Sequence, residues 1–290
     1  MPHHSPSVAT SPLPVAWLPS ALWVPAQGDR RQVAVLVHGI WGSARNLRTL
    51  AVALVEAAPN WTILAVDLRN HGDSRAAPPP HTLDASADDV LRLCQHHGMQ
   101  PRAVIGHSFG GKVAMALAQQ HLPALKYLAV LDTLPHLRAD QDASASSARQ
   151  MVAILQTVPQ PLAARTDVIA HLRHAGCSEQ VCQWMTTNLE PGTDGYRWKF
   201  DLAGVDAMLN SYFATDSWPL LRDPPAALTI DVVRAGQSPL WTSEVLASFA
   251  RLPPAVRLHV LPNAGHWLHV DDLDGVVAIV GHGLRQVSDG

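Results

Sequence analysis

The sequence predicts an α/β fold in which a doubly wound, mostly parallel sheet is interrupted by an inserted helical lid. Short apolar runs rich in β-branched residues alternate with stretches of helical spacing up to residue 132, and the alternation resumes after residue 226. Between these parts the chain shows helical spacing without a convincing strand. Alternating strands and helices are typical of right-handed βαβ units, which assemble into such a sheet.

Four buried strands, bounded by Gly, Pro or Asp, build the first half of the predicted sheet. They span residues 33–37, 62–66, 103–105 and 127–131. Helical spacing fills the intervals over residues 47–58, 85–94 and 113–121, and Pro123 follows the last of them. Residues 1–32 precede the first strand and are expected to form a Pro-rich N-terminal tail and lead-in.

Residues 133–225 are the predicted insertion, because apolar residues recur there at one-face helical spacing, as in Met151, Ile154, Leu155 and Val158. The segment lies between two sheet strands, which places it near the strand ends where doubly wound folds bind ligands, so we expect a lid. A helical subdomain that packs on the sheet without touching substrate is the alternative. Strands at 227–233 and 256–261 and helices at 244–252 and 273–287 complete a core of residues 33–132 and 226–290.

Composition limits the class of protein. A chain of 290 residues with 47% hydrophobic residues can bury one large core, so one main domain with an insertion is expected. The formal net charge of −3 comes from charges of both signs scattered along the chain, without a Lys/Arg run that could follow a phosphate backbone. Nucleic acid and anionic membrane surfaces are therefore not expected partners.

The cysteines and the N-terminus indicate a compartment. Cys94, Cys177 and Cys182 are few and odd in number, unlike the disulfide framework of a secreted domain, and this favours a reducing environment. The N-terminus lacks a basic start followed by an apolar stretch, and no run approaches ~20 apolar residues. We therefore expect a cytoplasmic protein without membrane insertion.

The strongest local signal is a Gly-x-Ser-x-Gly motif from Gly106 to Gly110, centred on Ser108. A predicted strand runs into the motif and a helical pattern follows it, which is typical of a nucleophile elbow. The turn exposes the serine hydroxyl, and the small residues on both sides let strand and helix approach closely. An incidental serine in a Gly-rich loop is the alternative, and the flanking elements argue against it.

A serine nucleophile needs a base that removes its proton and an acid that orients the base. The segment Asn263-Ala264-Gly265-His266-Trp267 follows the last predicted strand, where a loop can carry an imidazole back over the strand ends. The chain contains 16 histidines. Position in the fold, and not residue type, therefore selects His266 as the base over neighbours such as His259 and His269.

The acid has more than one candidate. In many enzymes that place such a serine and histidine on a doubly wound sheet, a carboxylate follows the strand after the lid, but here that turn reads Ala235-Gly236-Gln237-Ser238-Pro239. Asp132 ends the strand after the nucleophile's helix, so its carboxylate would emerge at the same sheet edge, and we favour it. The alternative is that Asp132 caps the first helix of the lid and that Asp206 or Asp201 supplies the acid.

Acyl transfer also needs hydrogen-bond donors for the developing oxyanion. The backbone N–H of Phe109, next to the nucleophile, is one candidate, and the N–H of Ile40 in His38-Gly39-Ile40-Trp41-Gly42 is the other. Trp41, His107 and Trp267 adjoin these loops and are candidates for substrate binding, with packing as the alternative for the two tryptophans.

One cluster could bind a metal. His171, His174, Cys177 and Cys182 are close in sequence, but they lack the paired spacing that closes a tetrahedral site, so an ordinary helix face is favoured. We expect neither a metal nor an organic cofactor, because nucleophile, base and oxyanion donors are all protein groups.

Together these residues resemble the α/β-hydrolase superfamily from Val33 to the end of the chain. More narrowly, residues 67–74, 106–112 and 263–267 and the Gly-x-Ser-Pro turn look like those of the bacterial YbfF-type esterases and their mitochondrial abhydrolase-domain relatives. The resemblance implies a cofactor-free serine esterase that acts on short or medium acyl esters, with thioesters among the candidates. It also implies an acid after the strand that follows the nucleophile helix, which supports Asp132. The chain departs from that pattern at Phe109, where methionine is expected.

The expected function is therefore hydrolysis of a small carboxylic ester through an acyl-enzyme. A cofactor-free haloperoxidase or perhydrolase, a carbon–carbon bond hydrolase and an acyltransferase use the same three residue types and remain alternatives. A haloalkane dehalogenase or epoxide hydrolase is disfavoured, because it needs a carboxylate at the position of Ser108. A non-catalytic ligand-binding homologue is a further alternative, against which the complete set of catalytic residue types argues.

Overall fold

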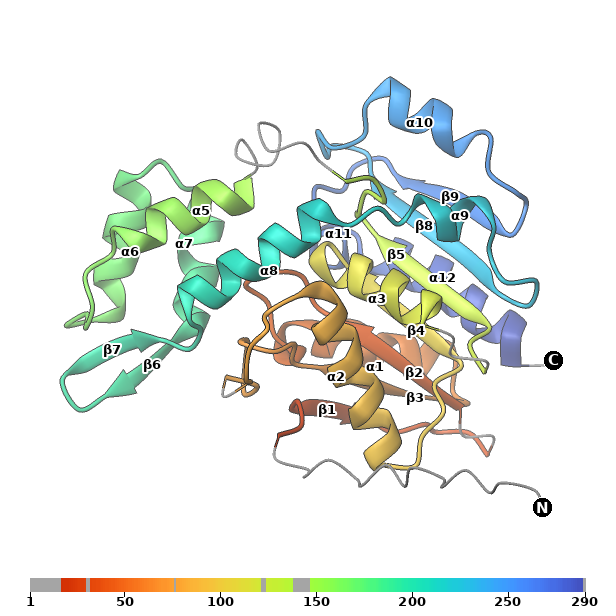
Figure 1. The fold of residues 1–290 in the computed structure, drawn as a ribbon, viewed down its shortest axis with the longest axis horizontal. Helices are drawn as coiled ribbons and strands as arrows, with labels where there is room; N and C mark the ends of the chain where they lie inside the picture. The colour runs from red at the N-terminus through yellow and green to blue at the C-terminus, as the bar shows by residue number, and fades with distance from the viewer. Residues whose placement is uncertain (1–16, 30–31, 76, 121–123, 138–146, 289–290) are drawn as a thin grey trace, which may run out of the picture.

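The computed structural model describes residues 17–29, 32–75, 77–120, 124–137 and 147–288. Residues 1–16 and 30–31 of the predicted tail lie outside them, as does Pro123 after the third predicted helix. Among the described residues a seven-stranded sheet of order β1-β3-β2-β4-β5-β8-β9 forms the centre of the molecule (Figure 1). All neighbouring strands pair in parallel except β1 and β3. The predicted doubly wound sheet is therefore confirmed.

The strands of this sheet are short. They are β1 (Ala21–Val24), β2 (Gln32–Val37), β3 (Trp61–Val66), β4 (Ala103–His107), β5 (Tyr127–Leu131), β8 (Thr229–Ala235) and β9 (Val256–Leu261). Helices cover both faces, so β4 and β5 are buried along their whole length. Val35 and Val37 point into one hydrophobic core and Ala34 and Leu36 into the other, as the two-residue period of a strand requires.

Two helical layers enclose the sheet. One layer contains α2 (Leu83–His96), α3 (Phe109–Gln119), α9 (Trp218–Arg222) and α10 (Ser243–Phe249). The other contains α1 (Arg48–Ala57), preceded by the 3₁₀ turn η1 (Ala44–Leu47), together with α11 (Leu268–Asp271) and α12 (Leu273–Ser288). Val276, Val280 and Leu284 recur every four residues in α12 and are completely buried, which explains why this stretch packs as a helix.

The structure contains strands that the sequence did not predict. β1 lies in the predicted lead-in and pairs with β3 in antiparallel fashion at the sheet edge. It is only four residues long and mostly half-buried, so it carries no clear alternation. In the segment predicted to be helical, β6 (Leu189–Gly192) and β7 (Gly195–Trp198) form an antiparallel hairpin. The sequence does not predict this hairpin because β6 contains proline and glycine, and both residues are depleted in strands.

The chain between β5 and β8, called the inserted segment below, has a hydrophobic core of its own. Its helices are α5 (Ser147–Gln156), α6 (Arg165–His174), α7 (Glu179–Met185), the 3₁₀ turn η2 (Thr186–Asn188) and α8 (Leu202–Ala214), followed by α9. Val168, Leu172, Cys182, Met185 and Val205 are completely buried in this core. Figure 1 shows α5, α6, α7 and the hairpin to one side of the sheet, with α8 running back toward it.

None of the helices in the described part of the chain is long and apolar enough to cross a membrane.

A buried charge cluster links three strands of the sheet. Asp231 in β8 is 1% exposed and accepts hydrogen bonds from the Tyr127 hydroxyl at 2.8 Å, from Arg257 Nε at 2.6 Å and from His259 Nε2 at 2.8 Å. Burial raises the pKa of Asp231, but hydrogen bonds from His259, Arg257 and Tyr127 outweigh burial, so the pKa lies below its usual value. The folded state therefore favours the ionised carboxylate.

We expect Asp231→Asn to lower the free energy of unfolding near neutral pH by roughly 3 kcal/mol, because it removes one partner of a buried ion pair. The pKa of Asp231 is lower in the folded than in the unfolded chain, so this stabilisation is complete above the unfolded value and is lost as the pH falls through the folded one. Urea unfolding of both proteins should show the difference at pH 7 and its decrease below about pH 4. A difference that does not change with pH would contradict the assignment of this stabilisation to the carboxylate.

Candidate active site

Ser108 lies in the turn between β4 and α3. Its backbone has φ +53° and ψ −119°, a conformation that residues other than glycine rarely adopt. Its N–H donates to the carbonyl of Leu131 at 2.9 Å, and its carbonyl accepts from the Thr133 hydroxyl at 2.8 Å. These bonds fix the turn to the end of β5, and the Ser108 side chain is half-buried.

The glycines on both sides of Ser108 are sterically required. A Cβ on Gly106 would lie 2.1 Å from the carbonyl oxygen of Gly110, and a Cβ on Gly110 would lie 2.5 Å from the carbonyl oxygens of Val37 and His38. Both distances are far shorter than van der Waals contact. The Gly-x-Ser-x-Gly pattern therefore follows from the close approach of strand, helix and the loop after β2.

His266 lies in the loop between β9 and α11, next to Ser108. The Ser108 hydroxyl is 3.0 Å from His266 Nε2, and His266 Nδ1 is 2.7 Å from Asp132 Oδ2. With the proton on Nδ1 donated to the carboxylate, Nε2 is free to accept the serine proton. The structure thus brings together the three residues that the sequence selected, from loops at the carboxyl ends of β4, β5 and β9.

Asp132 is completely buried at the end of β5, with φ +45°. Its N–H donates to Val233 in the neighbouring strand at 2.8 Å. Its other carboxylate oxygen, Oδ1, accepts from the Ala235 N–H at 3.0 Å and from the Trp241 indole N–H at 2.7 Å. Both oxygens are therefore engaged, and the carboxylate can rotate only by breaking these bonds.

Trp241 is the functional neighbour that the sequence reasoning did not identify. It lies before α10, is 8% exposed, and packs its ring against Phe249. The turn that lacks a carboxylate, Ala235 to Pro239, thus still contributes to the site, because it carries the Ala235 N–H and leads to the Trp241 donor. The only signal in the sequence was a tryptophan shortly after that turn.

The loop after β2 lies directly against Ser108. A Cβ on Gly39 would be 3.2 Å from Ser108 Cβ and 3.1 Å from His107 Nδ1. Phe109 is the first residue of α3, where a helix leaves its N–H without an intrahelical acceptor. No acceptor for the Ile40 N–H occurs among the described residues either. Within the described part of the chain both amides therefore have no hydrogen-bond acceptor, as the oxyanion role predicted for them requires.

Two buried neutral histidines hold this loop. His38 donates from Nδ1 to the Gly39 carbonyl at 2.7 Å and accepts the Leu68 N–H at Nε2 at 3.0 Å. His71 accepts the Trp41 N–H at Nε2 at 3.1 Å. Burial is the main cause that lowers the pKa of His38 to about 4 and that of His71 to about 3. Both rings thus keep an acceptor nitrogen at neutral pH.

A family model described as the alpha/beta hydrolase fold matches residues 33–273. The chain belongs to this family. The matched region runs from β2 to the start of α12 and includes Ser108, Asp132 and His266.

This α/β hydrolase has relatives among characterised proteins. It is 31% identical over 246 residues to the sn-1-specific diacylglycerol lipase ABHD11 of Mus musculus, which covers 82% of this chain and 76% of the relative. It is 31% identical over 255 residues to the esterase YbfF of Escherichia coli K12, which covers 85% of this chain and 90% of the relative. The predicted resemblance to YbfF-type esterases and abhydrolase-domain proteins is therefore confirmed.

Solved structures agree with this fold. A marine microorganism esterase superposes with a TM-score of 0.78 over 92% of this chain and 100% of the other, at 21% sequence identity. At this level of identity the likeness shows the α/β hydrolase fold alone.

The three predicted substrate-binding residues of this hydrolase lie in different environments. Trp41 is 3% exposed and packs edge-on against Phe200 of the inserted segment at 5.0 Å. His107 is buried and donates from Nε2 to the His266 carbonyl at 2.7 Å. Burial, followed by the neighbouring His269 and His266, holds the pKa of His107 well below its usual range. Both side chains are buried in contacts with neighbouring residues, and their role in substrate binding stays a prediction.

Trp267 differs from the other two, because it is only half-buried. Its ring meets Trp184 of α7 edge-on at 5.3 Å, so the inserted segment touches the residue next to His266.

The alternative acids lie elsewhere in the hydrolase. Asp201 caps α8, where its carboxylate accepts from the N–H groups of Ala203 and Gly204. Asp206 pairs with Arg149 on α5. Both carboxylates are thus used within the inserted segment, and His266 meets Asp132.

The histidines and cysteines considered as a metal site do not come together. No group of three or more His, Cys, Asp or Glu side chains that could hold a metal occurs in the described part of the chain. His171 Nε2 instead lies 2.8 Å from the Thr157 hydroxyl, and Cys182 is completely buried in the core of the inserted segment. The ordinary helix face favoured by the sequence fits these contacts.

Proposed function

We propose that this α/β hydrolase cleaves carboxylic esters through an acyl-enzyme intermediate, with Ser108 as nucleophile, His266 as general base and Asp132 as the acid that orients it. The observation that carries the proposal is the unbroken hydrogen-bond chain from Ser108 Oγ through His266 to Asp132, beside two amides that have no acceptor among the described residues. Serine is a weak nucleophile alone, so contact with a base that can take its proton is the chemical requirement, and His266 makes this contact.

In the proposed reaction, Ser108, His266 and the two backbone amides act in the following order. Ser108 Oγ attacks the ester carbonyl carbon while His266 Nε2 takes the hydroxyl proton. The carbonyl oxygen becomes an oxyanion that accepts from the Ile40 and Phe109 N–H groups. The tetrahedral intermediate collapses, the C–O bond to the alcohol breaks, and the His266 imidazolium protonates the departing alkoxide. Water then repeats the sequence on the acyl-enzyme and releases the acid.

The substrate class rests on the relatives and on the inserted segment. Relatives include an esterase and an sn-1-specific diacylglycerol lipase, which support an ester with an aliphatic acyl group. We propose that residues 133–225 act as a lid over the acyl group, with Trp267 and Trp184 forming an apolar wall beside His266. No metal or organic cofactor has a step in this mechanism.

A panel of p-nitrophenyl esters from acetate to laurate, extended by a 1,2-diacylglycerol and an acyl thioester, tests this function. We expect kcat/KM to be highest for a short or medium acyl chain, and to stay unchanged after prolonged incubation with a metal chelator. Parallel assays with an added alcohol or hydrogen peroxide measure acyl transfer and perhydrolysis. If turnover is faster with the alcohol or with hydrogen peroxide than with water, the main activity is acyl transfer or perhydrolysis and not hydrolysis.

A further inference from the structure

Trp41 is held from two sides at the loop that carries the proposed oxyanion donor Ile40. Its N–H donates to His71 Nε2, which belongs to the core domain, at 3.1 Å. Its carbonyl accepts from Asn188 Nδ2, which belongs to the inserted segment, at 3.0 Å. The peptide groups on both sides of the Trp41 Cα are thereby fixed, one by each part of the molecule.

The backbone of Trp41 is strained. Its φ is +65°, a left-handed conformation that is uncommon for a bulky residue and persists only when the surroundings impose it. The indole is 3% exposed and belongs to the hydrophobic core of the inserted segment, where it meets Phe200. The inserted segment therefore holds Trp41 by its ring and by its carbonyl, one residue away from Ile40.

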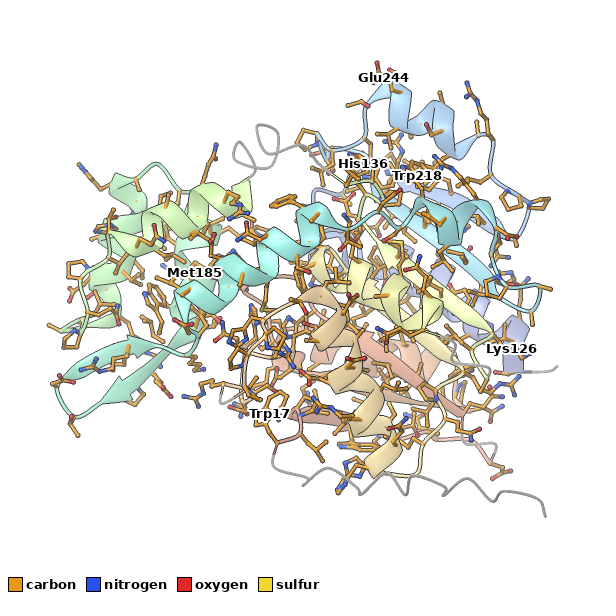
Figure 2. The ribbon with its side chains drawn as sticks, in the orientation of Figure 1. Trp17, Lys126, His136, Met185, Trp218 and Glu244 are labelled. Atoms are coloured by element: carbon orange, nitrogen blue, oxygen red, sulfur yellow. The ribbon has the colours of Figure 1, made fainter. Side chains whose placement is uncertain are left out.

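Asn188 is itself fixed by the fold of the inserted segment. It is 4% exposed, it ends η2, and its carbonyl accepts from the Lys199 N–H at 2.8 Å across the base of the hairpin. The neighbouring Met185 and Leu189 are completely buried in the same core, and Figure 2 labels Met185 within the inserted segment. The Asn188 amide is thus a preformed donor held in place by the inserted segment.

We propose that Asn188 is a positioning residue that couples the inserted segment to the oxyanion hole, so that the Ile40 N–H is correctly placed only while this segment is docked on the core. The proposal rests on the proposed function, since it assigns the Ile40 amide to the oxyanion. Asn188 does not touch the substrate. It acts by holding Trp41 in its left-handed conformation. This sets the direction of the Ile40–Trp41 peptide and so restricts the backbone of Ile40, whose N–H belongs to the peptide before it.

Other bonds between the two parts of the molecule provide a matched control. Ser211 in α8 accepts the Leu83 N–H at 3.0 Å, at the start of α2 and away from the loop after β2. Ser211→Ala removes one hydrogen bond between the inserted segment and the core, as Asn188→Ala does. It leaves every contact of Trp41 in place, so a general loosening of the inserted segment would affect both variants.

We expect Asn188→Ala to lower kcat for a p-nitrophenyl ester by at least about tenfold with KM within about twofold, because a misplacement of ~1 Å can cost ~100-fold in rate. The inhibition constant of an aryl trifluoromethyl ketone, whose serine adduct carries an oxyanion, should rise by the same factor. Ser211→Ala should stay within about twofold of wild type in all three quantities. An unchanged kcat, a loss confined to KM, or an equal loss in Ser211→Ala would overturn the proposal.

Hydrogen–deuterium exchange separates this proposal from the proposed function. In Asn188→Ala the Trp41 and Gly42 amides, which donate to His71 and Gly39, should exchange at least about tenfold faster, and they should be unchanged in Ser211→Ala. This readout does not need turnover, so it decides the coupling even if wild type hydrolyses no ester. Slow exchange at these amides in Asn188→Ala would refute the coupling. Asn188→Leu, which keeps the side-chain volume, replaces the alanine variant if that variant does not fold.

Discussion

Replacing Ser108 by alanine should reduce ester hydrolysis to the background rate, a loss on the order of 10⁶-fold in kcat. The hydroxyl that forms the acyl-enzyme is absent, and none of the other residues that the structure describes makes this contact with His266 Nε2. The side chain is half-buried in a turn, so its removal leaves no core cavity and the melting temperature should change little. Steady-state assays with the best ester of the panel measure the effect.

Ser248→Ala is the control for this experiment. Ser248 lies on α10, where its exposed hydroxyl donates to the Glu244 carbonyl at 3.0 Å. This variant should keep wild-type turnover. Activity in Ser108→Ala above one part in about a thousand of wild type, with contamination excluded, would be incompatible with the assignment.

Asp132→Asn should fold normally and lose about 10⁴-fold in kcat, the size of the loss when the corresponding acid of a serine protease is changed in this way. The Ala235 N–H and the Trp241 indole both donate to Oδ1 and will select the amide oxygen of the new side chain for that position. Its NH₂ group then faces His266 Nδ1. The imidazole must accept there and carry its proton on Nε2, so it cannot take the proton from Ser108.

Asp201→Asn and Asp206→Asn test the alternative acids. Both should retain activity within about tenfold of wild type, because their carboxylates make helix-cap and ion-pair contacts inside the inserted segment. Near-normal turnover in Asp132→Asn together with a large loss in either of these variants would move the role of the acid to the inserted segment.

Local sequence determined the nucleophile turn, and a structural reason is now visible. Gly106 and Gly110 are required because any Cβ there collides with backbone atoms. The motif is therefore a direct consequence of the geometry of this turn. Asp132 could be selected from topology alone, since β4 and β5 are parallel neighbours and their carboxyl ends meet at one edge. The same argument placed the loop of His266 beside them.

The other parts of the fold and of the site were not predictable from the sequence, because they depend on contacts between residues that are distant in sequence. Trp241 reaches Asp132 across 109 positions, and Asn188 reaches Trp41 across 147, with no local pattern to indicate either contact. Substrate contact and packing were both open for Trp41 from its place beside a site loop, and no local pattern indicates that its indole lies in the core of the inserted segment. The hairpin of that segment was missed because Pro191 and Gly192 in β6 are poor strand formers.

Covalent labelling with a fluorophosphonate probe tests the central claim most directly, because the reagent reacts only with a serine that a neighbouring base activates. Mass spectrometry of the digested wild-type protein should find the label on Ser108 alone, with ester hydrolysis lost in proportion to labelling. Asp132→Asn should react far more slowly, since His266 is then held in the wrong tautomer. A label on another serine, or full ester turnover in protein that carries the label on Ser108, would contradict the account.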